Sequence, residues 1–337
     1  MRRPSSLDID DWDRNDENCV SLTWSVDADG NMRHKPTKMC VSVDRGIAFE
    51  GREYRLSPDD IELSGPVLGG GAGGVVQLGA IKGSGTQVAI KTIRMDDREK
   101  RRQLLNEIRS LVQAEGCPYL VQWYAGFVSQ KIHAVHVILE YLDLGSLGNL
   151  RMKLGSHGVP AQHLSCIAMQ ATAGLVHLHS LRVLHRDVKP QNVLLNSLGE
   201  VKLTDFGIAK VMEPTVQAAC SVVGTQTYMS PERVKGGYYS FNSDVWSLGM
   251  VVYEMAAGRY PFPEVTSFIV LFDYLCQRPE PRLDDAVFPE ALCCFVALCL
   301  SRDPAERSGS ENLAAHEFAV AGQGLQEEFA MWLATVF

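Results

Sequence analysis

One short segment concentrates side chains whose types and spacing could transfer a phosphoryl group. It reads His185-Arg186-Asp187-Val188-Lys189-Pro190-Gln191-Asn192, and Asp205-Phe206-Gly207 follows it. Phosphoryl transfer depends on positioning and charge neutralisation, so Asp187 would accept a hydroxyl proton and Lys189 would neutralise the γ-phosphate. Asn192 and Asp205 would bind two magnesium ions between the phosphates, and Gly207 would let the chain turn sharply afterwards. Each acid taken singly could be a loop surface charge, but the joint pattern favours chemistry.

A glycine cluster upstream has the composition of a phosphate-binding loop. Gly69, Gly71 and Gly74 lie close together and Val76 follows them, and a backbone without side chains can approach phosphate oxygens. The same spacing opens a Rossmann unit, but there a helix follows. Here the β-branched run 75–78 follows, and there is no Gly-Lys-Ser/Thr motif. The pattern therefore predicts a β-hairpin that covers a nucleotide.

A lysine and a glutamate form a third candidate feature. Lys91 ends the strand-like run 88–91, where a solvated lysine is the simple interpretation. Residues three and four apart share a helix face, which puts Glu107 with Leu104 and Leu111 on an apolar stripe. A buried carboxylate is costly unless it is paired, so we expect Glu107 to pair with Lys91 and hold it near the α- and β-phosphates. The alternative is a glutamate at the solvent edge of the stripe.

The elements that must position these residues change character along the chain. Apolar runs between glycine clusters predict antiparallel strands over 61–94, with a turn at Gly83-Ser84-Gly85. Apolar residues at helical spacing predict a helix over 98–115. Further strands are expected near 120–127 and 135–141, and further helices near 161–180, 243–258, 265–276 and 288–300. Strands followed by helices predict an α+β chain with two different lobes.

The bulk composition excludes several classes of protein. The 337 residues are 46% hydrophobic and 21% charged, which is ordinary for globular domains. A formal net charge of -8 argues against nucleic-acid binding, and no apolar run reaches the roughly 18 residues of a membrane span. The nine cysteines form no Cys-x-x-Cys pair, so we expect reduced thiols in a core. These observations favour a cytoplasmic chain, with the nucleus as a second compartment.

The motifs and their order over 61–320 resemble a eukaryotic protein kinase domain. Ser230-Pro231-Glu232 resembles the Ala-Pro-Glu motif, and the run 243–249 resembles the buried helix whose aspartate, here Asp244, binds the catalytic loop. Arg307 resembles the late arginine that pairs with Glu232. The resemblance implies a bilobal fold with an antiparallel-sheet N-lobe, one main N-lobe helix and a mostly helical C-lobe. It also implies Ser/Thr-type chemistry, because Lys189 lies two residues after Asp187.

The same resemblance implies ATP and Mg2+ as cofactors and places the nucleotide on a defined set of residues. Glu140, Tyr141 and Leu142 would form the hinge, Leu139 the gatekeeper, and Leu194 the surface beneath the adenine. The full expected ATP site comprises Leu68, Gly69, Gly71, Gly74, Val76, Ala89, Lys91, Leu139, Glu140, Leu142 and Leu194.

Three further segments resemble the MAP kinase kinase family. They are 221–233, 98–109 and 258–261. That family phosphorylates both Thr and Tyr in the activation loop of a MAP kinase and is itself activated by an upstream MAP kinase kinase kinase. The resemblance therefore implies these two partners, with no nucleic acid and no membrane span.

Two hydroxyl residues in the expected activation loop predict a switch. Thr215 and Ser221 are separated by five residues, which resembles the spacing of plant-type members. Phosphate there would add roughly -1.5 to -2 charge and could pair with Arg186. Solvated loop hydroxyls are the alternative, and Pro214 before Thr215 departs from the pattern. Cys220 is either a thiol sensor or, more simply, a bystander.

The two ends of the chain lie outside the expected kinase lobes. The domain boundaries we expect are an N-terminal arm over 1–57, an N-lobe with hinge over 58–142, a C-lobe over 143–320 and a helical tail over 321–337. The arm is expected to be partly disordered, with one strand near 39–43. At its start, Arg2 and Arg3 precede Leu7 and Ile9, which resembles a docking motif for MAP kinases.

Two other functions remain open from the sequence. One is a kinase one tier higher in the same cascade. The other is a pseudokinase scaffold, for which missing Lys91, Asp187 or Asp205 would have argued. All three residues are present, so the sequence favours an active enzyme.

Overall fold

The computed structural model describes 24–26, 31–34, 39–42, 47–49, 52–54, 56–63, 65–71, 74–94, 108, 111, 115–129, 134–206, 227–262, 265 and 267–337. The chain divides into two compact units. The first combines Met1–Leu105 with Gln122–Tyr141, and the second combines Asn106–Val121 with Leu142–Phe337. Within the described ranges, no helix is both long and apolar enough to cross a membrane.

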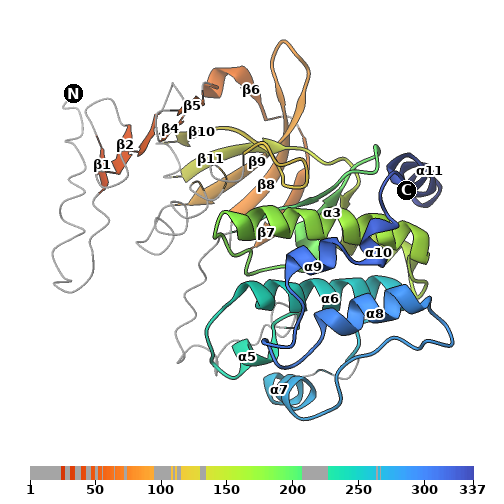
Figure 1. Ribbon diagram of the computed structural model, residues 1–337. Helices are drawn as coiled ribbons and strands as arrows, with labels where there is room; N and C mark the ends of the chain where they lie inside the picture. Colours follow the sequence, from red (N-terminus) through yellow and green to blue (C-terminus); the bar gives the residue numbers. More distant parts are fainter. Residues whose placement is uncertain are drawn as a thin grey trace, which may run out of the picture. The chain divides into compact units, whose positions relative to one another are not determined.

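An antiparallel sheet of six strands forms the main part of the first unit (Figure 1). Five strands follow the order β10-β11-β9-β8-β6, and β7 also pairs with β8. Their bounds are β6 Ile61–Glu62, β7 Val67–Gly71, β8 Gly74–Ile81, β9 Gln87–Arg94, β10 Trp123–Ser129 and β11 Ala134–Glu140. The strands expected from the apolar runs are therefore confirmed, and the glycine-containing turn connects β8 to β9.

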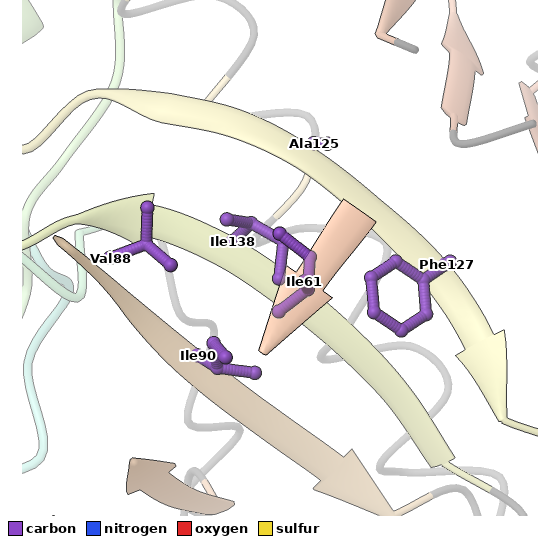
Figure 2. Close-up of a cluster of buried hydrophobic side chains, with 6 residues drawn as sticks. All are labelled: Ile61, Val88, Ile90, Ala125, Phe127 and Ile138. Atoms are coloured by element: carbon purple, nitrogen blue, oxygen red, sulfur yellow. The ribbon is translucent and has the colours of Figure 1, made fainter. Parts of the chain in front are cut away.

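Alternation along β9 divides its side chains between the two faces of this sheet. Val88 and Ile90 lie in an apolar cluster on one face (Figure 2). The other members of the cluster are Ile61, Ala125, Phe127 and Ile138. Successive strand residues point to opposite faces, so Ala89 and Lys91 point away from this cluster. Burying each large apolar side chain is worth about 1.5–3 kcal/mol, and the cluster thereby fixes the orientation of β9.

A second antiparallel sheet of short strands precedes the main sheet in the chain. Its strands follow sequence order, with bounds β1 Trp24–Val26, β2 Met32–His34, β3 Met39–Val41, β4 Ile47–Phe49 and β5 Arg52–Tyr54. The amide of Val128 in β10 donates to the carbonyl of Ser42 at 3.1 Å and so connects the two sheets. The strand expected near 39–43 corresponds to β3. The other four strands were not expected, because three residues are too few for alternation to be visible in a sequence.

Helices form most of the second unit. Their bounds are α2 Leu147–Leu154, α3 Ala161–Ser180, α5 Pro231–Val234, α6 Phe241–Ala257, α7 Phe268–Cys276, α8 Glu290–Cys299, α9 Ser310–Ala314, α10 Glu317–Val320 and α11 Gln326–Val336. The long helix α3 contacts α6, α9 and α10, and α8 packs against α6 (Figure 1). The four later helices expected from apolar periodicity are confirmed as α3, α6, α7 and α8. Of the helix expected over 98–115, the structure describes Ile108 and Leu111, which are both helical and buried, and Glu115, which lies in a turn.

A three-stranded sheet in the second unit brings two sequence motifs to one edge. Strands β12 Gly145–Ser146, β13 Val193–Leu195 and β14 Val201–Leu203 are antiparallel and lie in that order. A 3-10 turn, η4 Pro190–Asn192, leads directly into β13. Because β13 and β14 pair antiparallel, the start of β13 and the end of β14 lie side by side. Asn192 and Asp205 therefore come to the same end of this hairpin.

The C-terminal helix α11 packs against α3 within the second unit. Its Trp332 ring stacks on His163 of α3, with ring centroids 4.8 Å apart, and its Phe329 is fully buried. Gln162 donates to the Glu328 carboxylate at 2.8 Å. This helix lies within the segment 321–337, where a helical tail was expected.

Candidate active site

The catalytic-loop segment brings three of the predicted side chains into direct contact. Lys189 Nζ lies 2.7 Å from Asp187 Oδ2. The Asn192 side-chain amide donates to the Asp187 backbone carbonyl at 2.8 Å and to Asp187 Oδ2 at 3.1 Å. Pro190 suits the first position of the η4 turn because that position needs no amide donor. The turn thereby places Asn192 over Asp187.

Both side-chain contacts of Asp187 use the same carboxylate oxygen. Among the described residues, Oδ1 has no hydrogen-bond partner, and the side chain is 22% exposed. A carboxylate with one free oxygen can accept the proton of an approaching hydroxyl. Lys189 is 17% exposed beside it and carries a positive charge where a phosphoryl group would arrive. The geometry suits proton acceptance next to charge neutralisation.

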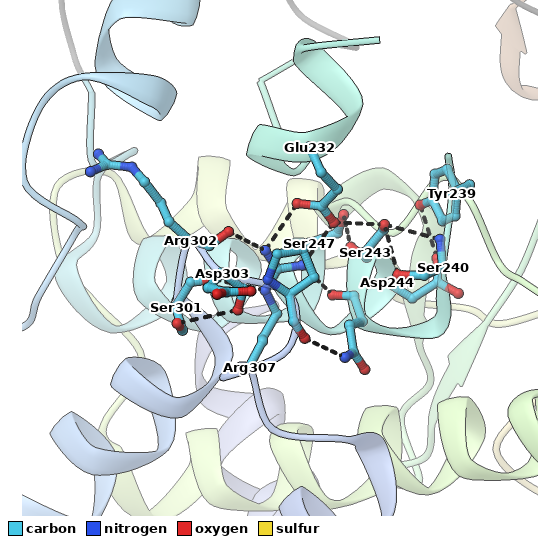
Figure 3. Close-up of polar contacts among 12 residues, drawn as sticks. Glu232, Tyr239, Ser240, Ser243, Asp244, Ser247, Ser301, Arg302, Asp303 and Arg307 are labelled. Atoms are coloured by element: carbon cyan, nitrogen blue, oxygen red, sulfur yellow. Dashed lines mark hydrogen bonds and ion pairs between the residues drawn. The ribbon is translucent and has the colours of Figure 1, made fainter. Parts of the chain in front are cut away.

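A buried carboxylate on α6 binds the backbone of this loop. Asp244 is fully buried and accepts from the amides of His185 and Arg186, both at 2.8 Å. The Tyr239 hydroxyl donates to Asp244 Oδ1 at 2.9 Å (Figure 3). Arg186 has φ of 71°, in the left-handed region that non-glycine residues rarely adopt. The Asp244 bonds offset that strain, and the expected contact of this aspartate with the catalytic loop is confirmed.

The segment after β14 is tied to the same loop. The Thr204 amide donates to the Asn192 carbonyl at 3.0 Å, and Asp205 follows with φ of 59°. Phe206 is buried and lies edge-on to the His185 ring, with centroids 6.2 Å apart. Complete burial lowers the pKa of His185, so its ring is neutral and packs as part of this core.

Lys91 occupies the centre of the main sheet in the first unit. It pairs with Val76 of β8 and Val137 of β11, and the residue is 2% exposed. A lysine this buried needs partners that satisfy its charge, which excludes the simple solvated-strand interpretation. Glu107, its expected partner, lies outside the described residues.

The glycine-rich segment forms a tight hairpin between β7 and β8. Gly71 pairs with Gly74, whose φ is 118°. A Cβ at Gly74 would lie 2.3 Å from the Thr92 carbonyl oxygen, so only glycine fits. A Cβ at Gly69 would meet nothing within 4 Å, and Leu68 is 43% exposed. The hairpin expected from the glycine spacing is confirmed.

The remaining predicted nucleotide-site residues divide between the two units. Leu139 and Glu140 end β11 in the first unit, where the Glu140 amide donates to the Gln122 carbonyl at 2.9 Å. Leu142 is 3% exposed and belongs to the second unit, as does Leu194 of β13. Several predicted positions lie outside the described residues: Arg2, Arg3, Leu7, Ile9, Glu107, Gly207, Thr215 and Ser221.

An ion pair on the second unit was expected from the sequence and is confirmed. Arg307 donates to both carboxylate oxygens of Glu232, at 2.9 and 3.0 Å (Figure 3). The Arg307 side chain is 0% exposed, and its guanidinium lies 5.1 Å from the centre of the Trp246 ring. Burial acts to raise the pKa of Glu232, but the bonds and charge of Arg307 outweigh it and the pKa is lowered.

Several residues that support the site were not identified from the sequence. Tyr239 binds Asp244, and the Tyr228 hydroxyl donates to Glu254 at 2.5 Å. The Ser247 hydroxyl donates to the Tyr228 carbonyl at 2.7 Å and so fixes the chain just before the Ser230-Pro231-Glu232 motif. These contacts join residues that are distant in the chain, and no short motif marks them.

The donor set at this site suits magnesium. In the described part of the chain, no three His, Cys, Asp or Glu side chains form a metal cage. Magnesium prefers oxygen ligands and is usually bound by one or two carboxylates together with substrate phosphates and water. Asn192 and Asp205, at one end of the β13–β14 hairpin, offer this kind of set.

A comparison with known protein families identifies the class of this protein. Residues 64–319 match the protein kinase domain family. The strand-rich and helical units are those of the bilobal protein kinase fold, and together with this match they define an ATP-dependent protein kinase.

Relatives narrow the class further. Mitogen-activated protein kinase kinases 1 and 2 of Arabidopsis thaliana are 38% identical over 277 residues and 39% identical over 271 residues. These alignments cover 80% and 78% of this chain, and 77% and 73% of the relatives. Dual specificity mitogen-activated protein kinase kinase 1 of Dictyostelium discoideum is 42% identical over 198 residues, which is 58% of this chain and 29% of that relative. The chain belongs to the MAP kinase kinase family.

Proposed function

We propose that this chain transfers the γ-phosphate of ATP to both the threonine and the tyrosine of a MAP kinase activation loop. Membership of the MAP kinase kinase family supports this substrate class, and the Dictyostelium relative carries dual specificity in its name. The observation that carries the proposal is the contact of Asp187 with Lys189 and Asn192, on a loop whose backbone is bound by Asp244.

Each residue of the catalytic set has a proposed role. Asp187 accepts the proton of the substrate hydroxyl, and Lys189 stabilises charge on the phosphoryl group in flight. Lys91 binds the α- and β-phosphates, with Glu107 as its partner. Its burial in the middle of the sheet supports a role beyond that of a surface lysine.

Separate sets of residues are proposed to bind the phosphates, the adenosine and the metal ion. The glycine hairpin around Gly69, Gly71 and Gly74 covers the phosphates. Leu68, Val76, Ala89, Leu139, Glu140, Leu142 and Leu194 contact the adenosine. Asn192 and Asp205 bind Mg2+, which when present neutralises charge between the phosphates.

Activation by phosphorylation is proposed at Thr215 and Ser221. Arg186 is the partner for the added phosphate, because its backbone is bound by Asp244 while its side chain is exposed. Within the described residues, Arg186 forms no ion pair. An exposed guanidinium on a fixed backbone can bind phosphate with two parallel hydrogen bonds.

Two partners complete the proposal. A MAP kinase is the substrate, and Arg2, Arg3, Leu7 and Ile9 contribute a docking segment for it. An upstream MAP kinase kinase kinase phosphorylates the activation loop. Deletion of residues 1–9 should weaken phosphorylation of a MAP kinase without changing intrinsic ATP hydrolysis. Equal efficiency for the deleted and full chains would refute the docking role.

A substrate panel distinguishes this function from that of a kinase one tier higher. The chain would be incubated with kinase-inactive MAP kinases, kinase-inactive MAP kinase kinases and a generic acceptor such as casein, and the modified sites would be mapped by mass spectrometry. Phosphate on both the threonine and the tyrosine of one MAP kinase loop supports the proposal. Phosphate only on MAP kinase kinases, or only on serine and threonine, would contradict it.

A further inference from the structure

Asp244 has another side-chain partner, His179, on the oxygen that also accepts the His185 amide. His179, near the end of α3, places Nε2 3.1 Å from Asp244 Oδ2. The other ring nitrogen, Nδ1, lies 2.9 Å from the hydroxyl of Ser310, the first residue of α9. Ser310 is 6% exposed, and the side chains of His179 and Asp244 are 8% and 0% exposed. A buried chain of hydrogen bonds therefore runs from α9 through α3 to α6.

The donor and acceptor of each hydrogen bond in this series follow from the other partners of Asp244. Within the described part of the chain, its other hydrogen bonds come from the His185 amide, the Arg186 amide and the Tyr239 hydroxyl, which all donate. An ionised carboxylate only accepts, so His179 donates through an Nε2 proton. In the neutral ring Nδ1 is then bare, and the Ser310 hydroxyl donates to it.

Without the Ser310 hydroxyl, both neutral tautomers of the His179 ring would be unfavourable. With the proton on Nε2, the buried Nδ1 would have no donor among the described residues, and an unsatisfied buried acceptor is costly. With the proton on Nδ1, the bare Nε2 lone pair would face the Asp244 carboxylate. Either tautomer would hold Asp244 less firmly in place, and Asp244 binds the strained backbone at Arg186.

We propose that Ser310 is a positioning residue for phosphoryl transfer. Its hydroxyl keeps the His179 ring in the tautomer that donates to Asp244, and Asp244 in turn holds the backbone that carries Asp187. Ser310 does not act as a nucleophile, because its hydroxyl is buried and is used as a donor to the ring. The residue acts at a distance, through two side chains.

The first test compares single variants of the full chain. Ser310→Ala removes the hydroxyl and Ser310→Thr retains one. Ser308→Ala is a matched control, because among the described residues the Ser308 hydroxyl bonds only the neighbouring Gly309 carbonyl, at 3.5 Å. The readouts are kcat and the KM for ATP in intrinsic MgATP hydrolysis, which needs no protein acceptor, together with melting temperature. Loss of one buried hydrogen bond predicts a fall in kcat of about fivefold to tenfold for Ser310→Ala, with KM unchanged. Ser310→Thr and Ser308→Ala should remain near wild type.

The second test asks whether Ser310 acts through His179. His179→Phe removes both ring nitrogens, and in that background Ser310→Ala should cause no further loss of kcat. An equal loss in both backgrounds would overturn the proposal. So would a lower melting temperature with unchanged kcat, which would make Ser310 purely structural.

Hydrogen exchange at backbone amides provides a measurement that does not require the His179 variant to fold. In Ser310→Ala alone, exchange at His185 and Arg186 should be faster than in wild type. Unchanged exchange at these two amides would overturn the proposal.

Discussion

Replacing Asp244 by asparagine tests how the catalytic loop is positioned. The carboxylate accepts two donors on each oxygen: Oδ1 receives the Arg186 amide and the Tyr239 hydroxyl, and Oδ2 receives the His185 amide and His179. Asparagine has one accepting oxygen and one donating amide group. In either orientation its amide group therefore faces two donors.

The cost of Asp244→Asn depends on which of the four donors can adapt to the new amide group. The tyrosine hydroxyl can rotate and the histidine can change tautomer, but a backbone amide can do neither. One backbone amide is therefore left without an acceptor in either orientation, at a cost of about 1–3 kcal/mol. The freed amide belongs to His185 or Arg186, directly before Asp187. Since a displacement of about 1 Å can cost about a hundredfold in rate, we expect Asp244→Asn to lower kcat at least tenfold.

Amide exchange and steady-state kinetics measure both consequences. Exchange at residues 185 and 186 should rise about tenfold to a hundredfold in Asp244→Asn, with kcat falling and the KM for ATP nearly constant. Tyr239→Phe is the matched control: it removes one donor, leaves no amide unpaired and should cost about 1 kcal/mol or less. Wild-type exchange together with wild-type kcat in Asp244→Asn would refute the reasoning.

Three further predictions concern stability and nucleotide binding. Arg307→Lys retains the charge but loses the two-point contact with Glu232, so it should lower unfolding free energy by about 1–3 kcal/mol in urea denaturation; no change would count against the ion pair. Gly74→Ala should lower both the melting temperature and ATP affinity, because its Cβ would meet a β9 carbonyl oxygen at 2.3 Å. Gly69→Ala should spare the melting temperature and weaken ATP binding alone. Because burial lowers the pKa of His185 below 6.5, only the unfolded chain binds that proton just below pH 6.5. Stability should therefore fall as pH drops from 7 toward 5, by at most about 1.4 kcal/mol per pH unit for this group, and a flat melting profile would contradict this.

The parts of the site that a sequence can predict are those encoded in short segments. Asp187, Lys189 and Asn192 lie within six residues of one another, and the turn that brings them together is itself local. Strand β9 was predictable because it contains the apolar run Val88-Ala89-Ile90, which follows the glycine-containing turn. The pair of Glu232 and Arg307 was expected only through family resemblance.

Other parts depend on tertiary packing and leave no local signal. His179 meets Asp244 across 65 residues and Ser310 across 131. In the sequence, Ser310 resembles any serine at the start of a helix, and His179 resembles a histidine near the end of one. The strands of the N-terminal sheet are three residues long, which is too short for a period of two to be distinguished from a loop.

We propose that Asp187 accepts the proton of the acceptor hydroxyl when phosphate is transferred from ATP to a MAP kinase loop. The most direct measurement compares wild type with Asp187→Ala for transfer to a kinase-inactive MAP kinase, with nucleotide affinity measured in parallel. General base catalysis is worth about a hundredfold to ten-thousandfold, so transfer to both threonine and tyrosine should fall by that factor while ATP still binds. Wild-type rates of transfer in the Asp187→Ala variant would contradict the account.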